Sequence, residues 1–160
     1  MMKRKTLLIV ALCLLSFLPA RAQEGLQIDS LFSGSVVDFS DRSKITELIV
    51  TGSELKPYNL KYFRSISFKA DAKMIANIAK LIEADARKAV DTKIDYQGGQ
   101  LNYALLRLAC EDSRENQYVG FQLKGTKGEV KGPFKSACVT VVYLRGKATM
   151  SDLNFMFKQR

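Results

Sequence analysis

The chain of 160 residues contains no histidine, and this absence excludes several classes of enzyme. Catalysis by Ser-His-Asp or Cys-His groups needs an imidazole as the general base, and many zinc sites need one as a ligand. A reaction catalysed by this chain would have to rely on carboxylates, lysine, tyrosine or a thiol. No spacing typical of a cofactor or metal site replaces the missing imidazole, so we expect neither a cofactor nor a metal.

Long apolar runs are also absent, apart from residues 7–18. That run is shorter than the ~20 residues of a membrane-spanning helix. It follows the basic stretch Lys3-Arg4-Lys5 and leads to Ala20-Arg21-Ala22, a pattern typical of a secretory signal peptide with small residues before the cut. We therefore predict a signal peptide over residues 1–22. Residues 23–160 then form a single domain that is periplasmic or secreted and has no integral membrane segment.

The positive charge of the chain is concentrated in one segment. The formal net charge of +9 falls to +5 without residues 1–22, which hold four of the 25 basic residues and no acid. Residues 121–147 alone have a balance of +5, because only Glu129 opposes Lys124, Lys127, Lys131, Lys135, Arg145 and Lys147. A solvated hairpin tip explains such lysines without a function. The functional hypothesis is attraction to an anionic envelope polymer, which salt would weaken, and export argues against nucleic acid.

The spacing of apolar residues predicts an α+β domain. We expect strands over residues 44–51, 64–69, 93–97, 100–111, 116–124 and 136–145. A helix over residues 71–90, capped by Asp71, and a short terminal helix, capped by Ser151, complete the pattern. The strand over residues 44–51 is apolar on both faces, which predicts a central position. The fold should be two-layered, with an antiparallel sheet of five or six strands covered on one face by both helices.

Two cysteines, Cys110 and Cys138, lie outside the predicted signal peptide. If the last four strands form a meander, their strands are two places apart, roughly 9–10 Å at the ~4.8 Å strand spacing. A disulfide needs Cα atoms within about 7 Å. The sequence leaves a disulfide and two packed thiols as alternatives, and this geometry favours the thiols.

Two further groups of residues are candidates for a site. Residues 56–64 interleave basic and aromatic side chains, a mixture on which sugar rings stack, and Tyr58, Lys61 and Tyr62 are the binding candidates there. The alternative is a loop that folds Tyr58, Leu60 and Phe63 onto the core while its charged groups stay in water. Glu111, Asp112 and Glu115 could supply the paired carboxylates of a glycoside hydrolase, but the sequence favours the alternative of a polar hairpin turn.

Three stretches resemble small exported proteins of Bacteroidetes bacteria that form a family of unknown function. They are QEGLQIDSLF at residues 23–32, KPYNLKYFRS at residues 56–65 and YLRGKATMSDL at residues 143–153. The resemblance covers essentially the whole chain after residue 22. It implies a Gram-negative envelope setting, and it brings no catalytic or ligand-binding residue.

These observations leave enzyme activity open and favour a non-catalytic role. The leading hypothesis is a periplasmic module that uses its basic hairpin to bind an envelope protein or an anionic envelope polymer. The alternative hypothesis is a small carboxylate-dependent hydrolase of the cell envelope.

Overall fold

A computed structural model of the chain describes residues 25–36, 44–112, 114–125 and 136–158. The predicted signal peptide and Lys127, Lys131 and Lys135 of the basic segment lie outside these residues. No helix in the described part of the chain is long and apolar enough to cross a membrane.

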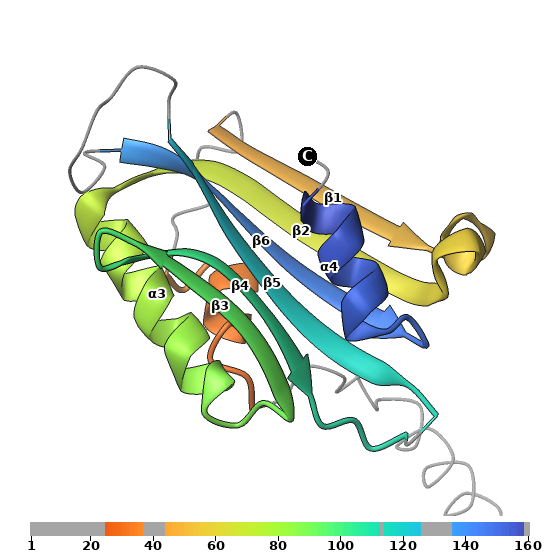
Figure 1. The fold of residues 1–160 in the computed structure, drawn as a ribbon. Coiled ribbons are helices and arrows are strands. Elements are labelled where there is room, and N and C mark those ends of the chain that lie inside the picture. Colours follow the sequence, from red (N-terminus) through yellow and green to blue (C-terminus); the bar gives the residue numbers. More distant parts are fainter. Residues whose placement is uncertain (1–24, 37–43, 113, 126–135, 159–160) are drawn as a thin grey trace, which may run out of the picture.

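Six antiparallel strands form one open sheet in the order β1-β2-β6-β5-β4-β3 (Figure 1). The strands are β1 (Ile45–Thr51), β2 (Leu60–Asp71), β3 (Asp91–Gln97), β4 (Gln100–Leu108), β5 (Asn116–Gly125) and β6 (Ser136–Gly146). The predicted meander of the last four strands is confirmed. Its first turn is Gly98-Gly99, where both residues have positive φ (57° and 80°), as a two-residue hairpin turn requires. The predicted α+β class is confirmed as well.

Helix α3 (Ala72–Ala86) covers one face of the sheet. Asp71 caps it as predicted, since the Asp71 carboxylate accepts a hydrogen bond of 2.8 Å from the Met74 N–H. The apolar stripe of the helix, Ile75, Ile78 and Ile82, is fully buried against side chains of β2, β4, β5 and β6. In each of these strands every second residue points to this face and packs against the apolar stripe of the helix.

A buried acid holds the N-terminal segment against the same face. The short helix α2 (Asp29–Phe32) places Leu31 and Phe32 in the α3-side core. The fully buried Asp85 carboxylate accepts hydrogen bonds from the Gln27 N–H at 2.8 Å and the Ile28 N–H at 3.0 Å. Asp85 lies on the apolar stripe of α3 because its position, three residues after Ile82, continues the helical spacing.

The terminal helix α4 (Met150–Lys158) lies on the opposite face from α3, so the prediction that both helices cover one face is wrong (Figure 1). Its Leu153 packs into a second core with Leu105, Tyr118 and Val142. The strands carry apolar residues on both faces of the sheet, so either face could accept a helix. The apolar stripe of α4 does not indicate which of the two faces the helix covers. The cap is Thr149 rather than Ser151, because Thr149 and Asp152 exchange hydrogen bonds as a capping box.

Strand β1 lies at the edge of the sheet and pairs only with β2, so its predicted central position is wrong. Leu48 and Ile49 are 51% and 53% exposed. The same side chains that suit a buried central strand also have high strand propensity on a half-exposed edge, and propensity alone does not separate the two cases. The 3₁₀ helix η3 (Ser53–Tyr58) connects β1 to β2.

Candidate binding surface

The predicted binding residues that the structure describes fall into two groups at opposite ends of the sheet. Lys124 is exposed near the end of β5, where it pairs with Cys138. Tyr62 pairs with Arg145 at the other end of β6, seven residues away or roughly 23 Å along the strand. The structure therefore does not bring Tyr58, Lys61 and Tyr62 together with Lys124.

At the Tyr62 end of the sheet, Tyr62 and Lys61 contact other side chains of the protein itself. Tyr62 is half-buried, and its ring meets the Tyr143 ring edge-on with centroids 5.8 Å apart. Lys61 donates to the Glu115 carboxylate, and Tyr58 is exposed in η3. Of the residues that the alternative interpretation folds onto the core, Leu60 is buried and Phe63 packs against the same cluster, whereas Tyr58 is exposed.

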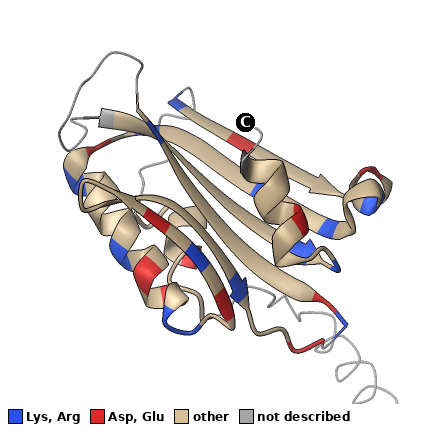
Figure 2. Cartoon of the chain, viewed as in Figure 1, with Lys and Arg blue, Asp and Glu red and all other residues tan. Residues whose placement is uncertain are grey.

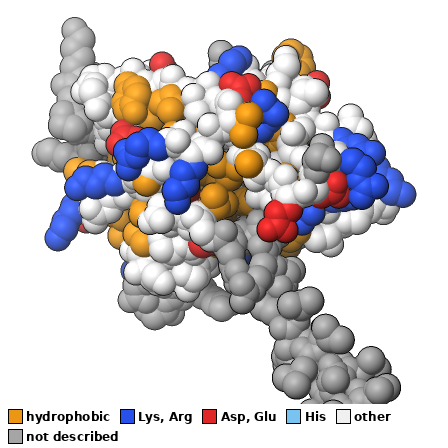
Figure 3. All heavy atoms as spheres, turned by 90° about the horizontal axis from the view of Figure 1, so that it is seen from below, with side chains coloured by type: hydrophobic (Ala, Val, Ile, Leu, Met, Phe, Trp, Pro, Cys, Tyr) orange, Lys and Arg blue, Asp and Glu red, His pale blue; other side chains and the backbone are white. Residues whose placement is uncertain are grey.

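Two acids of the predicted acidic cluster, Asp112 and Glu115, are each paired with cations. The buried Glu115 side chain accepts from Lys61 and, at 2.6 Å, from Arg145 Nε. The hydrogen bond from Lys61, followed by that from Arg145, lowers the pKa of Glu115. Asp112 accepts from Arg114, which lowers the pKa of Asp112 in the same direction. A general acid in a hydrolase needs the opposite shift. On the face of the molecule that Figure 3 shows from below, acidic and basic side chains lie in neighbouring groups.

The two cysteines are free and far apart. The pairing of β4 with β5 and of β5 with β6 brings Leu108 level with Arg145, seven residues from Cys138 along β6, and Cys110 follows Leu108 beyond the end of β4. Cys110 is half-buried, and its Sγ lies 3.3 Å from Gln117 Nε2. Cys138 is exposed, so the expectation of a packed thiol is wrong for this residue because its side chain is on a part of the sheet that α4 does not cover.

A continuous row of polar side chains crosses the α4 side of the sheet. In the strand register, each member of the row is directly opposite the next. From β1 to β3 the row is Thr46, Ser67, Thr140, Gln122, Tyr103 and Asp95. Ser67 and Thr140 share a hydrogen bond of 2.9 Å. Every member is exposed or half-buried, so this polar row faces accessible space. In Figure 1, α4 covers one part of this face and the strands continue beyond it.

A second row, one step nearer the end of β5, is basic. Lys69 on β2, Cys138 on β6 and Lys124 on β5 are direct neighbours across three strands, and all three are exposed. Cross-strand neighbours have Cβ atoms about 4.5–5.5 Å apart. Neither lysine forms an ion pair with another residue in the described ranges. Figure 2 shows that the central strands carry few charged residues along most of their length, so this row is a local concentration of positive charge.

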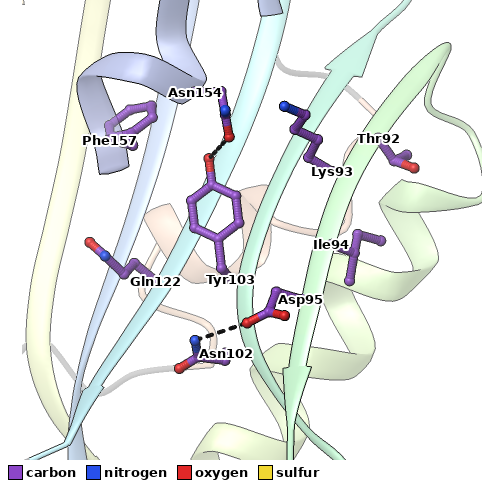
Figure 4. A pocket seen from close by; sticks show the side chains of 9 residues that line it. All are labelled: Thr92, Lys93, Ile94, Asp95, Asn102, Tyr103, Gln122, Asn154 and Phe157. Atoms are coloured by element: carbon purple, nitrogen blue, oxygen red, sulfur yellow. Dashed lines mark hydrogen bonds between the residues drawn. The ribbon is translucent and has the colours of Figure 1, made fainter. Parts of the chain in front are cut away.

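An open pocket of about 720 Å³ lies between α4 and the strands β3 and β4. Tyr103 stands in its middle, with Gln122 and Phe157 on one side of the ring and Lys93 and Asp95 on the other (Figure 4). Further lining residues are Thr92, Ile94, Asn102 and Asn154. Burial raises the pKa of Tyr103, so its hydroxyl keeps its proton and can donate a hydrogen bond. Within the described residues there is no cluster of acidic or thiol side chains suited to a metal ion.

Sequence reasoning missed Lys69 and the whole polar row. The alternation of Gln122 and Lys124 with buried residues is visible in the sequence and predicts their shared face. What the sequence lacks is the strand order, since only the pairing of β2 with β6 brings Lys69 level with Lys124.

In the comparison with protein families, the model of a family of unknown function matches residues 15–157. This chain belongs to the family DUF6108. The expectation of a family of unknown function is thereby confirmed, while the Bacteroidetes source and export stay predictions. The comparisons with curated proteins and with solved structures gave no significant match. The function of this DUF6108 member must therefore be argued from its own surface.

Proposed function

We propose that this DUF6108 protein is a non-catalytic binding module of the bacterial periplasm that binds an anionic polymer of the cell envelope. The observation that carries the proposal is the basic row, in which Lys69 and Lys124 flank Cys138 on an accessible part of the sheet. Lys127, Lys131 and Lys135 follow Lys124 in the sequence with Glu129 as the one acid among them. The signal-like residues 1–22 and the resemblance to exported Bacteroidetes proteins support the periplasmic setting.

Electrostatics favour a polymer over a compact ligand. Lys69 and Lys124 are separated by one strand, roughly 10 Å at the usual strand spacing. A chain with repeated negative groups can place one group on each ammonium, and each exposed contact contributes little by itself. Such binding sums several weak attractions, all of which salt screens over a Debye length of about 10 Å at 0.1 M.

The carboxylate-dependent hydrolase is the weaker proposal for this chain. Glu115 is neutralised by two cations and its pKa is lowered, so it is a poor proton donor near neutral pH. Asp112 is paired with Arg114 and also has a lowered pKa. Neither residue lines the pocket beside α4.

The test measures binding of the purified protein to micelles of Gram-negative lipopolysaccharide at 50 and 300 mM salt. We expect the double variant Lys69→Gln/Lys124→Gln to bind at least about fivefold more weakly at low salt, and the difference to shrink at high salt. The matched control is Lys73→Gln/Lys80→Gln, which removes the same charge from exposed positions of α3 on the other side of the sheet. Equal effects of the two double variants, or no salt dependence, would refute the proposal.

A further inference from the structure

We infer that the pocket beside α4 is a saccharide subsite, so that the anionic polymer of the proposed function is an acidic polysaccharide. The inference rests on the proposed function and names the chemistry of its ligand. One sugar ring lies in the pocket at Tyr103, and an acidic group of the same chain reaches the ammonium of Lys124.

The lining of the pocket suits a ring that carries hydroxyl groups. A sugar hydroxyl both donates and accepts hydrogen bonds, and amide side chains also do both. Three amides, Asn102, Gln122 and Asn154, surround the Tyr103 ring together with the Asp95 carboxylate and the Lys93 ammonium (Figure 4). The apolar side chains of the lining are few, so a fatty acid or another greasy ligand would leave these polar groups without partners.

The polar groups of the pocket have hydrogen-bonding capacity left for a ligand. The Tyr103 hydroxyl lies 3.4 Å from Asn154 Oδ1, and Asn102 Nδ2 lies 3.3 Å from Asp95 Oδ2. Both distances exceed the usual ranges, which are about 2.5–3.0 Å for O–H···O and about 2.7–3.2 Å for N–H···O hydrogen bonds. The half-buried Gln122 side chain makes no hydrogen bond to other described residues. A ligand hydroxyl can therefore improve existing contacts and satisfy Gln122 without breaking a strong internal bond.

Aromatic rings provide the apolar part of the contact. One face of a sugar ring consists mainly of C–H groups, which pack on an aromatic face. Tyr103 is half-buried and stands in the middle of the pocket, and Phe157 of α4 forms part of its wall. Phe157 lies over Gly120, where an added Cβ would be 4.0 Å from the Phe157 ring. This is an ordinary van der Waals distance, so the ring packs closely on β5 beside the pocket.

The pocket and the basic row are continuous along β5. Gln122 and Lys124 point to the same side of this strand and are two residues apart, roughly 7 Å. This separation is comparable to the advance of a polysaccharide chain per sugar. Since the polar row and the basic row are adjacent, a ring bound at Tyr103 places the acidic substituent of the same or the next sugar near Lys124.

The experiment measures affinity for a panel of acidic oligosaccharides, namely oligogalacturonate, alginate oligomers and heparan sulfate fragments, at 50 mM salt. Poly-glutamate of matched charge is the peptide probe, and dextran oligomers are the neutral probe. We expect at least one acidic oligosaccharide to bind about tenfold more tightly than poly-glutamate. Gln122→Ala and Tyr103→Ala should each weaken this binding about five- to tenfold, whereas Tyr103→Phe, which keeps the ring, should weaken it about twofold or less.

Circular dichroism and urea unfolding of each variant identify loss of folding, and Tyr103→Phe provides a second reading if Tyr103→Ala does not fold. If the pocket variants bind like the wild type while Lys69→Gln/Lys124→Gln binds weakly, the saccharide subsite is wrong and the proposed function stands. Poly-glutamate binding as tight as that of every saccharide would also overturn the subsite. If none of the acidic oligosaccharides binds, the subsite is wrong, and the lipopolysaccharide measurement decides the proposed function separately.

Discussion

Replacing the buried Asp85 with alanine should release the N-terminal segment from helix α3. In the native protein the Asp85 carboxylate accepts backbone hydrogen bonds from Gln27 and Ile28 at 2.8 and 3.0 Å, and its side chain is fully buried. A hydrogen bond to a charged group contributes about 1.5–3 kcal/mol, and the variant leaves two N–H donors without partners. Relief from burying the carboxylate, and the higher helix propensity of alanine, offset part of the loss. We expect Asp85→Ala to lower the free energy of unfolding by about 2–4 kcal/mol.

The assay is urea unfolding combined with hydrogen exchange at the amides of Gln27 and Ile28. Exchange at both amides should accelerate in Asp85→Ala more than exchange in the central strands. The matched control is Asp71→Ala, which removes the exposed cap at the other end of α3 and should cost about 1 kcal/mol without accelerating exchange at Ile28 relative to the rest of the chain. A loss below about 0.5 kcal/mol in Asp85→Ala would refute the tethering role.

Two further predictions concern the end of the sheet near Glu115. Glu115→Gln should lower the unfolding free energy by about 1–2 kcal/mol at pH 7, because a neutral amide cannot satisfy both Lys61 and Arg145. Since the folded-state pKa of Glu115 lies below its usual 4.5, this difference between wild type and variant should be full above pH 4.5 and shrink as the pH falls further. Urea unfolding at a series of pH values measures it, and a difference that grows in acid would contradict the ion cluster. Gly146→Ala should cost more than about 2 kcal/mol, because the new Cβ would lie 2.5 Å from the carbonyl oxygen of Asn59. Thermal unfolding compares it with Gly120→Ala, whose Cβ would make only ordinary van der Waals contacts, the nearest at 3.7 Å, and equal losses would show that the contact with Asn59 is unimportant.

The elements of the fold could be predicted from sequence because their signals are local. The stripe of Ile75, Ile78 and Ile82, the alternation around Phe121 and the Gly98-Gly99 turn each lie within a few residues, and the structure confirms all three. The side of the sheet that α4 covers depends on contacts between residues far apart in the chain. The sequence pattern holds no local signal for that choice.

The candidate surface depends on the same kind of long-range information. Gln122 and Lys124 are recognisable as residues on one face, but Lys69 and Tyr103 join them only through the strand order. Asp85 also depends on long-range contacts. The sequence shows an acid on an apolar stripe, but it does not show that the backbone of Gln27 and Ile28 binds it. A polar residue at a stripe position is the signal that could have indicated a buried contact.

The most direct test of the central claim is to map the ligand by NMR chemical-shift changes on the isotope-labelled protein during titration with the tightest-binding acidic oligosaccharide. The account predicts that the largest changes fall on the α4 side of the sheet, at Lys69, Thr140, Gln122, Lys124, Tyr103 and Asn154. Changes concentrated at the opposite end of the sheet, around Tyr62 and Glu115, or on the exposed side of α3, would contradict it.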